Sequence, residues 1–153
     1  MKKTILFLAL GFFALSANSQ TIKDSDVPPN IKESFSKLHP NTKVDKWEKE
    51  GLNYEVEFVE KNINTAVELG PNGQLLSTEV EMKVADLPKA VSDYCAKNMS
   101  GKKITEASKI TAANGQVSYE AEVDEADYIF DANGTFVKKE VDSHDDKDDH
   151  DKK

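Results

Sequence analysis

The chain has 153 residues and a formal net charge of −8 at pH 7, from 28 Asp and Glu against 20 Lys and no Arg. This balance excludes a nucleic-acid-binding protein, which needs a basic face to displace counterions from phosphates. The absence of Arg also removes the usual bidentate clamp for phosphate or carboxylate ligands, and the single Cys excludes an internal disulfide and a Cys-rich zinc site. The length predicts one domain with a modest core.

Residues 1–19 are typical of a secretory signal peptide. Two lysines precede an apolar run over residues 5–15, and small residues at positions 17 and 19 fit a cleavage site. The run is shorter than the roughly 20 apolar residues that a membrane-spanning helix needs. We therefore expect a mature chain that begins at Gln20 and is secreted, most simply into the periplasm, with no membrane insertion after cleavage.

An internal repeat follows the signal peptide. Three pairs of segments share a pattern in the same order, namely 26–31 with 86–91, 54–58 with 119–123, and 67–76 with 128–137. Chance explains one such match easily, but it explains several in the same order poorly. We predict one domain over residues 20–141 that contains two repeats, 26–82 and 86–141.

Each repeat is predicted to begin with a helix, because apolar residues recur there at helical spacing. These positions are Val27, Ile31, Phe35 and Leu38 in the first repeat and Leu87, Val91, Tyr94 and Cys95 in the second. Pro28 and Pro88 suit the first helical turn, where a missing N–H costs nothing. Asp26 and Asp86 are candidate N-caps.

The segments after each helix alternate between apolar and charged residues. Tyr54, Val56 and Phe58 point to one side of a predicted strand, and the glutamates between them point to the other. This alternation predicts an antiparallel sheet with one buried and one solvated face. Hairpin turns are predicted at 70–73, 114–115 and 131–134, the first and last with Gly in the left-handed position that closes a bulged hairpin.

This pattern, together with Pro40, Trp47-Glu48 and the pairs Asn72-Gly73 and Asn133-Gly134, resembles the PepSY-like, β-lactamase-inhibitor-protein-like (BLIP-like) domains of bacterial exported proteins. The resemblance covers residues 26–141. It implies an α+β fold, a tandem repeat of one helix plus a four-stranded antiparallel sheet, with the two sheets joined side by side and the helices on one face.

The same resemblance implies a function without catalysis. PepSY domains are thought of as peptidase-inhibiting or peptidase-regulating modules, and the lactamase inhibitor proteins grip an enzyme with the open face of their sheet. This chain has shorter repeats and lacks disulfides, so inhibition of a lactamase is not what we expect of it.

The residues themselves favour the same conclusion. Nucleophile elbows, phosphate-binding glycine loops and zinc-protease helices are absent from the sequence, so we expect no enzymatic activity and no cofactor. Cys95 lies on an apolar helix stripe and is expected to be a buried thiol. His39 lies at a helix end, where a role at the helix terminus is expected.

The solvated sheet face is the candidate partner-binding surface. Its predicted residues are Glu55, Glu57, Glu79, Glu81, Glu120 and Glu122, with Trp47 as an anchor. Trp47 is out of phase with Val44, so it lies on the open face unless a bulge returns it to the core. We hypothesise a monomeric, exported protein-binding module, a candidate regulator or inhibitor of an exported enzyme such as a peptidase, whose partner is an unknown exported protein.

Residues 142–153 contain no apolar side chain and are predicted to form a disordered tail. His144, Asp145, Asp148 and His150 are candidate ligands for weak metal binding. The tail lacks the register and the Gly of a calcium loop. The alternative function is therefore weak divalent-cation binding or buffering, through the acidic sheet face and this tail.

Overall fold

Nine strands and two ten-residue helices make up the part of the chain that the structure, a computed structural model, describes, residues 19–141. The strands are β1 (Ser19–Ile22), β2 (Val44–Glu50), β3 (Asn53–Glu60), β4 (Ile63–Leu69), β5 (Leu75–Glu81), β6 (Ala107–Ala112), β7 (Val117–Glu122), β8 (Asp127–Asp131) and β9 (Phe136–Glu140). The helices are α1 (Pro29–Leu38) and α2 (Lys89–Asn98). The predicted signal peptide, apart from Ser19, and the predicted tail lie outside the described residues.

All nine strands belong to one antiparallel sheet, in which they follow one another in chain order from β1 to β9. The predicted fold, a tandem repeat of one helix plus a four-stranded antiparallel sheet with the two sheets joined side by side, is therefore wrong, because the strands form a single nine-stranded sheet. β5 pairs directly with β6, from Ser77 opposite Ala112 to Glu81 opposite Ser108, and β1 adds a strand that the repeat pattern did not contain. Continuous pairing satisfies the backbone groups that two separate sheets would leave at their edges.

Each helix begins directly after a proline. Pro28 and Pro88 are the N-cap residues, one position earlier than predicted. Asp26 and Asp86 do not cap the helices, because each ends a short 3₁₀ turn that precedes the proline, and neither N-terminus has a side-chain cap. In the described residues no helix is long and apolar enough to cross a membrane.

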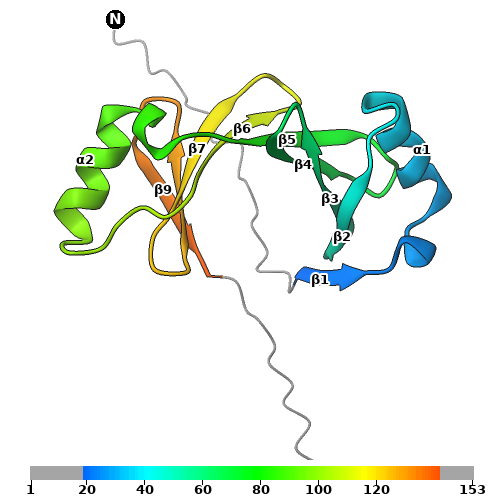
Figure 1. Cartoon of the computed structure of the whole chain (residues 1–153), viewed down its shortest axis with the longest axis horizontal. Helices are drawn as coiled ribbons and strands as arrows, with labels where there is room; N and C mark the ends of the chain where they lie inside the picture. Colours follow the sequence, from blue (N-terminus) through cyan, green and yellow to red (C-terminus); the bar gives the residue numbers. More distant parts are fainter. Residues whose placement is uncertain (1–18, 142–153) are drawn as a thin grey trace, which may run out of the picture.

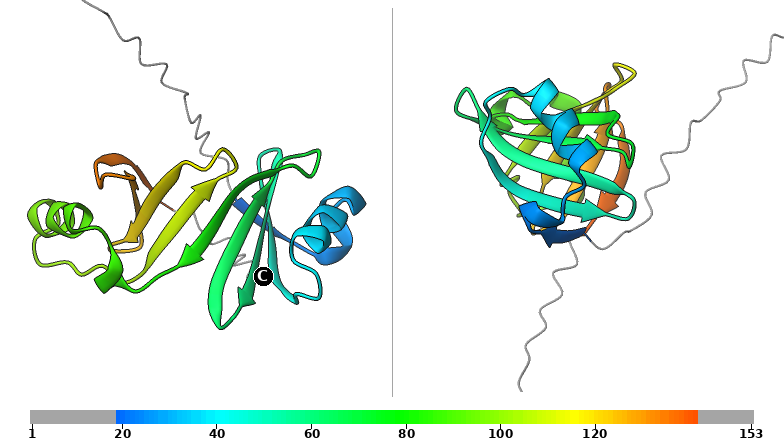
Figure 2. Two further views of the ribbon diagram at one scale, coloured as in Figure 1. Left: turned by 90° about the horizontal axis from the view of Figure 1, so that it is seen from above. Right: turned by 90° about the vertical axis from the view of Figure 1, so that its right-hand side faces the viewer.

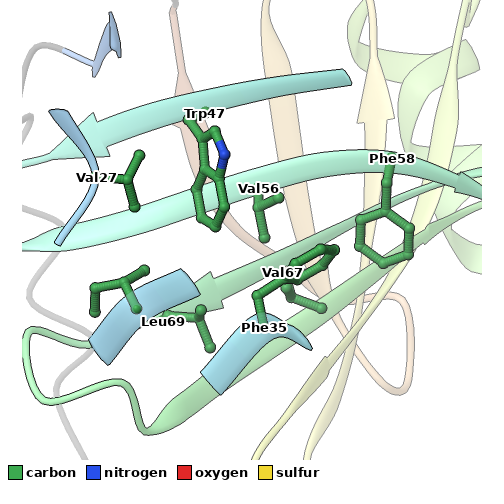
Figure 3. Packing of buried hydrophobic residues seen from close by; sticks show 8 residues of the cluster. Val27, Phe35, Trp47, Val56, Phe58, Val67 and Leu69 are labelled. Atoms are coloured by element: carbon green, nitrogen blue, oxygen red, sulfur yellow. The ribbon is translucent and has the colours of Figure 1, made fainter. Parts of the chain in front are cut away.

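Two hydrophobic clusters form the core, one beneath each helix. The first joins Val27, Ile31 and Phe35 to Trp47, Val56, Phe58, Val67 and Leu69. Figure 3 shows the sheet residues of this cluster pointing toward Phe35 on α1. The second joins Leu87, Val91, Cys95 and Met99 to Ala107, Ala121, Val123 and Phe130. The buried position predicted for Cys95 is confirmed, with 5% of its surface exposed.

The strand register places both clusters on the same side of the sheet. Side chains directly opposite in neighbouring strands share a face, and the pairing runs from Val56 to Val67, to Thr78, and on to Thr111 in β6. Figures 1 and 2 show α1 and α2 at opposite ends of the long axis, with the twisted sheet bending between them. The face that carries the helices is thus the outer one, and the other face lies inside the bend.

The predicted hairpin turns are confirmed. Gly73, Gly115 and Gly134 all have positive φ, and each donates its N–H to the carbonyl three residues earlier. Register shifts beside the first and last of these turns, in the β4–β5 and β8–β9 pairs, are the predicted bulges. Glycine meets this requirement because it adopts the left-handed conformation without a Cβ clash.

Candidate functional site

The inner face of the sheet, which we call the open face, carries rows of acidic side chains that run across the strands. One row contains Glu48, Glu55 and Glu68, which are directly opposite one another in β2, β3 and β4. A second contains Glu57 and Glu79, separated by Ala66. A third runs from Glu81 through Ser108 to Glu120, and a fourth contains Glu122, Asp127 and Glu140. The register thus brings together all six glutamates that the sequence predicted for this face.

A hollow of about 400 Å³ lies among the first three of these rows. Its lining includes Glu55, Glu57, Glu79 and Glu81 from the predicted set, and Asp45, Glu106 and Ser108 in addition. Sequence reasoning missed the added residues because Asp45 occupies a bulge and Glu106 precedes a strand. Glu48 was missed as well, although the alternation in β2 would place it beside Glu55 once Trp47 is assigned to the core.

Lys46 is the cation that contacts the β2–β3 end of this surface. Its Nζ lies 2.7 Å from Oε1 of Glu57 and 3.3 Å from Oε2 of Glu48. Burial alone would lower the pKa of Lys46, but the hydrogen bonds and charges of Glu57 and Glu48 outweigh burial and raise it. Lys46 is therefore held in the charged form by the two carboxylates.

Neutral donors hold other carboxylates of the open face. Asn53 Nδ2 donates to Oε1 of Glu68 at 2.8 Å, and Asn64 Nδ2 donates to Oε2 of Glu81 at 2.5 Å. At the far end, the Thr105 hydroxyl donates to Oε1 of Glu122 at 2.6 Å. These hydrogen bonds fix the positions of the three glutamate side chains. The donors are neutral, so they do not cancel the negative charge of the open face.

The carboxyl groups at the centre of the open face are difficult to ionise. Burial, reinforced by the charges of neighbouring carboxylates, raises the pKa of Glu55 to about 8 and that of Glu120 to about 9. Burial also raises the pKa of Glu79, against a hydrogen bond from Ser108 that acts to lower it. Half-buried like charges on adjacent strands repel one another, and protonation relieves the repulsion.

Trp47 does not lie on the open face. It is directly opposite Val56 on the helix-covered side, and 4% of its surface is exposed. The cause is a bulge in β2, since Val44 is opposite Phe58 but Lys46 is opposite Glu57, which leaves Asp45 as the extra residue. An extra residue reverses the side to which later side chains point. Trp47 as a surface anchor is therefore wrong, and of the two orientations considered the core position is correct.

The remaining predicted chemical groups lie away from the open face or outside the structure. His39 is the C-cap residue of α1, where it stacks on Phe35 and has Nδ1 3.4 Å from Oε1 of Glu60. The predicted metal ligands His144, Asp145, Asp148 and His150 lie outside the described residues. On the open face, Glu48, Glu55 and Glu57 each offer one oxygen within 4.8 Å of the others.

The comparisons with known proteins concern the region that folds into this sheet. A family model described as "Putative beta-lactamase-inhibitor-like, PepSY-like" matches residues 14–77 and 54–138, which together span most of the chain. The chain belongs to this PepSY-like family. The match confirms the resemblance seen in the sequence. No curated protein matches this PepSY-like chain at a significant level.

Solved structures share the fold of this PepSY-like protein. A BLIP-like protein from Bacteroides fragilis has a TM-score of 0.58 at 22% identity, with 80% of this chain and 94% of that one covered. A DUF2874 family protein from Bacteroides ovatus has a TM-score of 0.62 at 18% identity, covering 79% and 93%. A structure described as a putative periplasmic protein, from Bacteroides eggerthii, has a TM-score of 0.62 at 16% identity, covering 74% and 88%.

Proposed function

We propose that this PepSY-like protein is an exported, periplasmic binding module without catalytic activity, and that its open face docks a basic segment of another exported protein. The predicted signal peptide supports export, and so does the description of the similar Bacteroides eggerthii structure as a periplasmic protein. The BLIP-like description of the similar Bacteroides fragilis structure supports a binding role. On this proposal the module regulates or inhibits an exported enzyme such as a peptidase.

The observation that carries the proposal is the acidic hollow inside the bend of the sheet. Along the described strands, the lysines on this face are Lys46 and Lys138, and each already contacts glutamate. The remaining carboxylates of the open face therefore give this concave surface an excess of negative charge that is accessible to solvent. Such a surface attracts cationic partners, speeds their approach and excludes acidic ones.

The contact surface also needs an apolar element, and Val59 provides one in place of Trp47. Val59 follows Glu55 and Glu57 on the same side of β3, and 49% of its surface is exposed. Its neighbour across the β3–β4 pair is Asn64, which holds Glu81. An exposed apolar side chain next to fixed carboxylates suits a partner segment in which a basic residue neighbours an apolar one.

Cation binding is the second candidate function, favoured by the close approach of Glu48, Glu55 and Glu57. Oxygen ligands of this kind suit Ca²⁺ or Mg²⁺. However, Lys46 already lies between Glu48 and Glu57, so an ion at this position has to displace an ammonium group. We therefore rank cation binding below protein docking.

The proposal is tested by site-specific photo-crosslinking in cells that export the protein. A photoreactive amino acid at Val59 reports on the open face, and the same group at Lys97, which is exposed on α2, is the matched control. We expect one protein to be captured from position 59 and not from position 97. Its association rate, measured on the purified pair, should fall in Glu57→Lys and Glu81→Lys, most strongly at low salt, because exposed charges are screened over about 8–10 Å at moderate ionic strength.

The charge control is Glu33→Lys, which makes the same reversal on the exposed surface of α1 and leaves the open face unchanged. Circular dichroism of each variant checks that it is folded. Association that is equally fast in all three variants, or capture from position 97 alone, would mean that the partner contacts another surface. Added Ca²⁺ that displaces the partner at millimolar concentration would favour the second candidate function.

A further inference from the structure

We propose that β9, the last strand of the sheet, is the contact surface for a second copy of this chain, and that two copies pair antiparallel along their β9 strands to form one continuous sheet. This inference replaces the monomer expected from the sequence. It concerns an edge of the sheet, so it does not depend on what docks on the open face.

The edge of β9 is open to a further strand. In residues 19–141, β9 pairs with β8 alone, so the backbone groups along its other side have no neighbouring strand. Val137 in β9 and Val141 directly after it are exposed, with 56% and 64% of their surfaces accessible. An unpaired edge with exposed apolar side chains is a template for pairing with another chain.

The first repeat shows that a strand of this kind accepts two neighbours. Lysines and bulges can block an edge, and β9 has both, with Val137 as the extra residue of its bulge. β5 is the matching strand of the first repeat, with residue 75 corresponding to residue 136, and its bulge leaves Leu76 as the extra residue. β5 nevertheless pairs with β6 on its other side, from Ser77 onward. Ser77 corresponds to Lys138, so the same part of β9 has the geometry of a strand with two neighbours.

Charge selects the register in which two β9 strands would pair. Two copies related by a two-fold axis pair antiparallel, and the residue on the axis is opposite itself. With Lys139 on the axis, Lys138 of each copy is opposite Glu140 of the other, and Val137 is opposite Val141. Moving the axis by one residue places Lys138 opposite Lys138, or Glu140 opposite Glu140, and like charges directly opposite are destabilising. Only the first register is self-complementary.

The side chains of β9 fit this register. Lys138 Nζ lies 2.6 Å from Oε1 of Glu140 on the open face, so both charged groups are already at the edge where the second copy would pair. Lys139 would be opposite its own copy, but its Nζ lies 5.4 Å from the centre of the Tyr128 ring. Tyr128 is directly opposite Lys139 in β8, so this ammonium group points away from the free edge and the two copies of it are kept apart.

The pairing also determines how the two copies are arranged. Residues opposite one another in a sheet share a face, so the two-fold axis is perpendicular to the sheet and the open faces of the two copies lie side by side. A single pair of short strands buries less than the roughly 1,200 Å² of a standard interface. We therefore expect a weak dimer that dissociates on dilution.

The test is sedimentation equilibrium of the whole protein over a concentration series, at an ionic strength of about 0.15 M, where a Debye length of about 8 Å screens the net negative charge of the two copies. We expect a reversible monomer–dimer equilibrium. Lys138→Glu and Glu140→Lys each create two pairs of like charges in the dimer, so each should raise the dissociation constant about tenfold or more. An equimolar mixture of the two variants restores both opposite-charge pairs and should form a heterodimer.

The matched control makes the same charge changes on α1, with Lys37→Glu and Glu33→Lys. These variants, alone and mixed, should associate as the wild type does. Recovery on mixing the β9 variants would also exclude misfolding as the cause of their weaker association, since two misfolded chains do not repair each other. A wild type that stays monomeric up to about 1 mM, the weak end of specific association, would overturn the proposal. So would a dimer that the β9 variants do not weaken, or one that the α1 variants weaken equally.

A cysteine cross-link tests the register. Lys139→Cys places a thiol opposite its own copy, and the Cα atoms of antiparallel neighbours lie about 4.5–5.5 Å apart, a separation that a disulfide can bridge. We expect mild oxidation to link this variant as a dimer, but not Lys97→Cys on the exposed surface of α2. The native Cys95 is buried and should not compete. Equally fast cross-linking of the two variants would overturn the pairing along β9.

Discussion

The indole of Trp47 packs edge-on against Phe35, with 5.7 Å between ring centroids, and Phe35 does the same against Phe58 at 5.2 Å. This three-ring contact joins β2, β3 and α1, so Trp47 contributes to the stability of the core and is not part of a solvent-exposed binding surface. We predict that Trp47→Ala lowers the free energy of unfolding by about 3–5 kcal/mol, as is typical for a buried aromatic side chain. Urea unfolding followed by circular dichroism measures the loss, and a loss below about 1 kcal/mol would contradict the buried position.

Cys95 gives a second prediction for a single residue. Cys95 lies on the buried side of α2 with 5% of its surface exposed, and burial raises the pKa of its thiol. Because the thiolate is the reactive form, the folded protein should react slowly with a thiol reagent and the urea-unfolded protein quickly. The two labelling rates are compared by mass spectrometry. Fast labelling of the folded protein, or a dimer that a reductant dissociates, would contradict the buried thiol.

At the level of elements, the β8–β9 turn packs closely against α2. Gly134 has φ +78°, and a Cβ placed there would lie 2.7 Å from the Cβ of Ala90. Gly115 in the β6–β7 turn has φ +84° but nothing within 4 Å of such a Cβ. We predict that Gly134→Ala costs roughly 2–5 kcal/mol of stability, from the left-handed backbone and the clash together, and that Gly115→Ala costs only about 1–2 kcal/mol.

Thermal unfolding of the two variants is compared. Because both glycines have a left-handed backbone, the cost of placing alanine in that conformation is the same in both variants, and the difference in stability measures the clash with Ala90. Equal losses in the two variants would mean that the turn and α2 are not in contact.

The strands, turns and strand pairings differ in how well the sequence alone predicts them. Alternation in β3 and β7 and the Asn-Gly turns are local signals, and these strands and turns form as predicted. The bulge at Asp45 has no comparable local signal, so the sequence left two orientations open for Trp47. The resemblance implied that the two halves join side by side, but the register of β5 on β6 and the addition of β1 depend on contacts between separate segments, and the repeat pattern contains no information about them.

At the scale of the whole molecule, the acidic rows on the open face were predictable and their consequences were not. Alternation places Glu55, Glu57, Glu120 and Glu122 on one side of their strands, which any reader of the sequence can see. The bend of the sheet, with α1 and α2 on its outer side, comes from the accumulated twist of nine strands in one sheet. The raised pKa values of Glu55 and Glu120 therefore follow from burial and from neighbouring charges in the folded sheet, and no local sequence pattern indicates them.

The raised pKa values predict how stability depends on pH. The folded protein binds more protons than the unfolded chain between the ordinary glutamate pKa of 4.5 and the folded values of about 8 and about 9. The free energy of unfolding should therefore fall as pH rises through this window and level off above it. Urea midpoints across the window measure the fall. Glu120→Gln should flatten the profile and be more stable than the wild type at the alkaline end, whereas Glu125→Gln should follow the wild type.

The central claim, that the open face docks cationic segments, is tested most directly by amide ¹H–¹⁵N NMR of the labelled protein during titration with an oligolysine peptide at low salt. We predict saturable shifts in β3, β5 and β7, around Glu55, Glu79 and Glu120, with little change in α1 and α2, and a loss of these shifts when salt is added. Shifts that are confined to the helices, that are scattered over the whole surface, or that do not occur would contradict the claim.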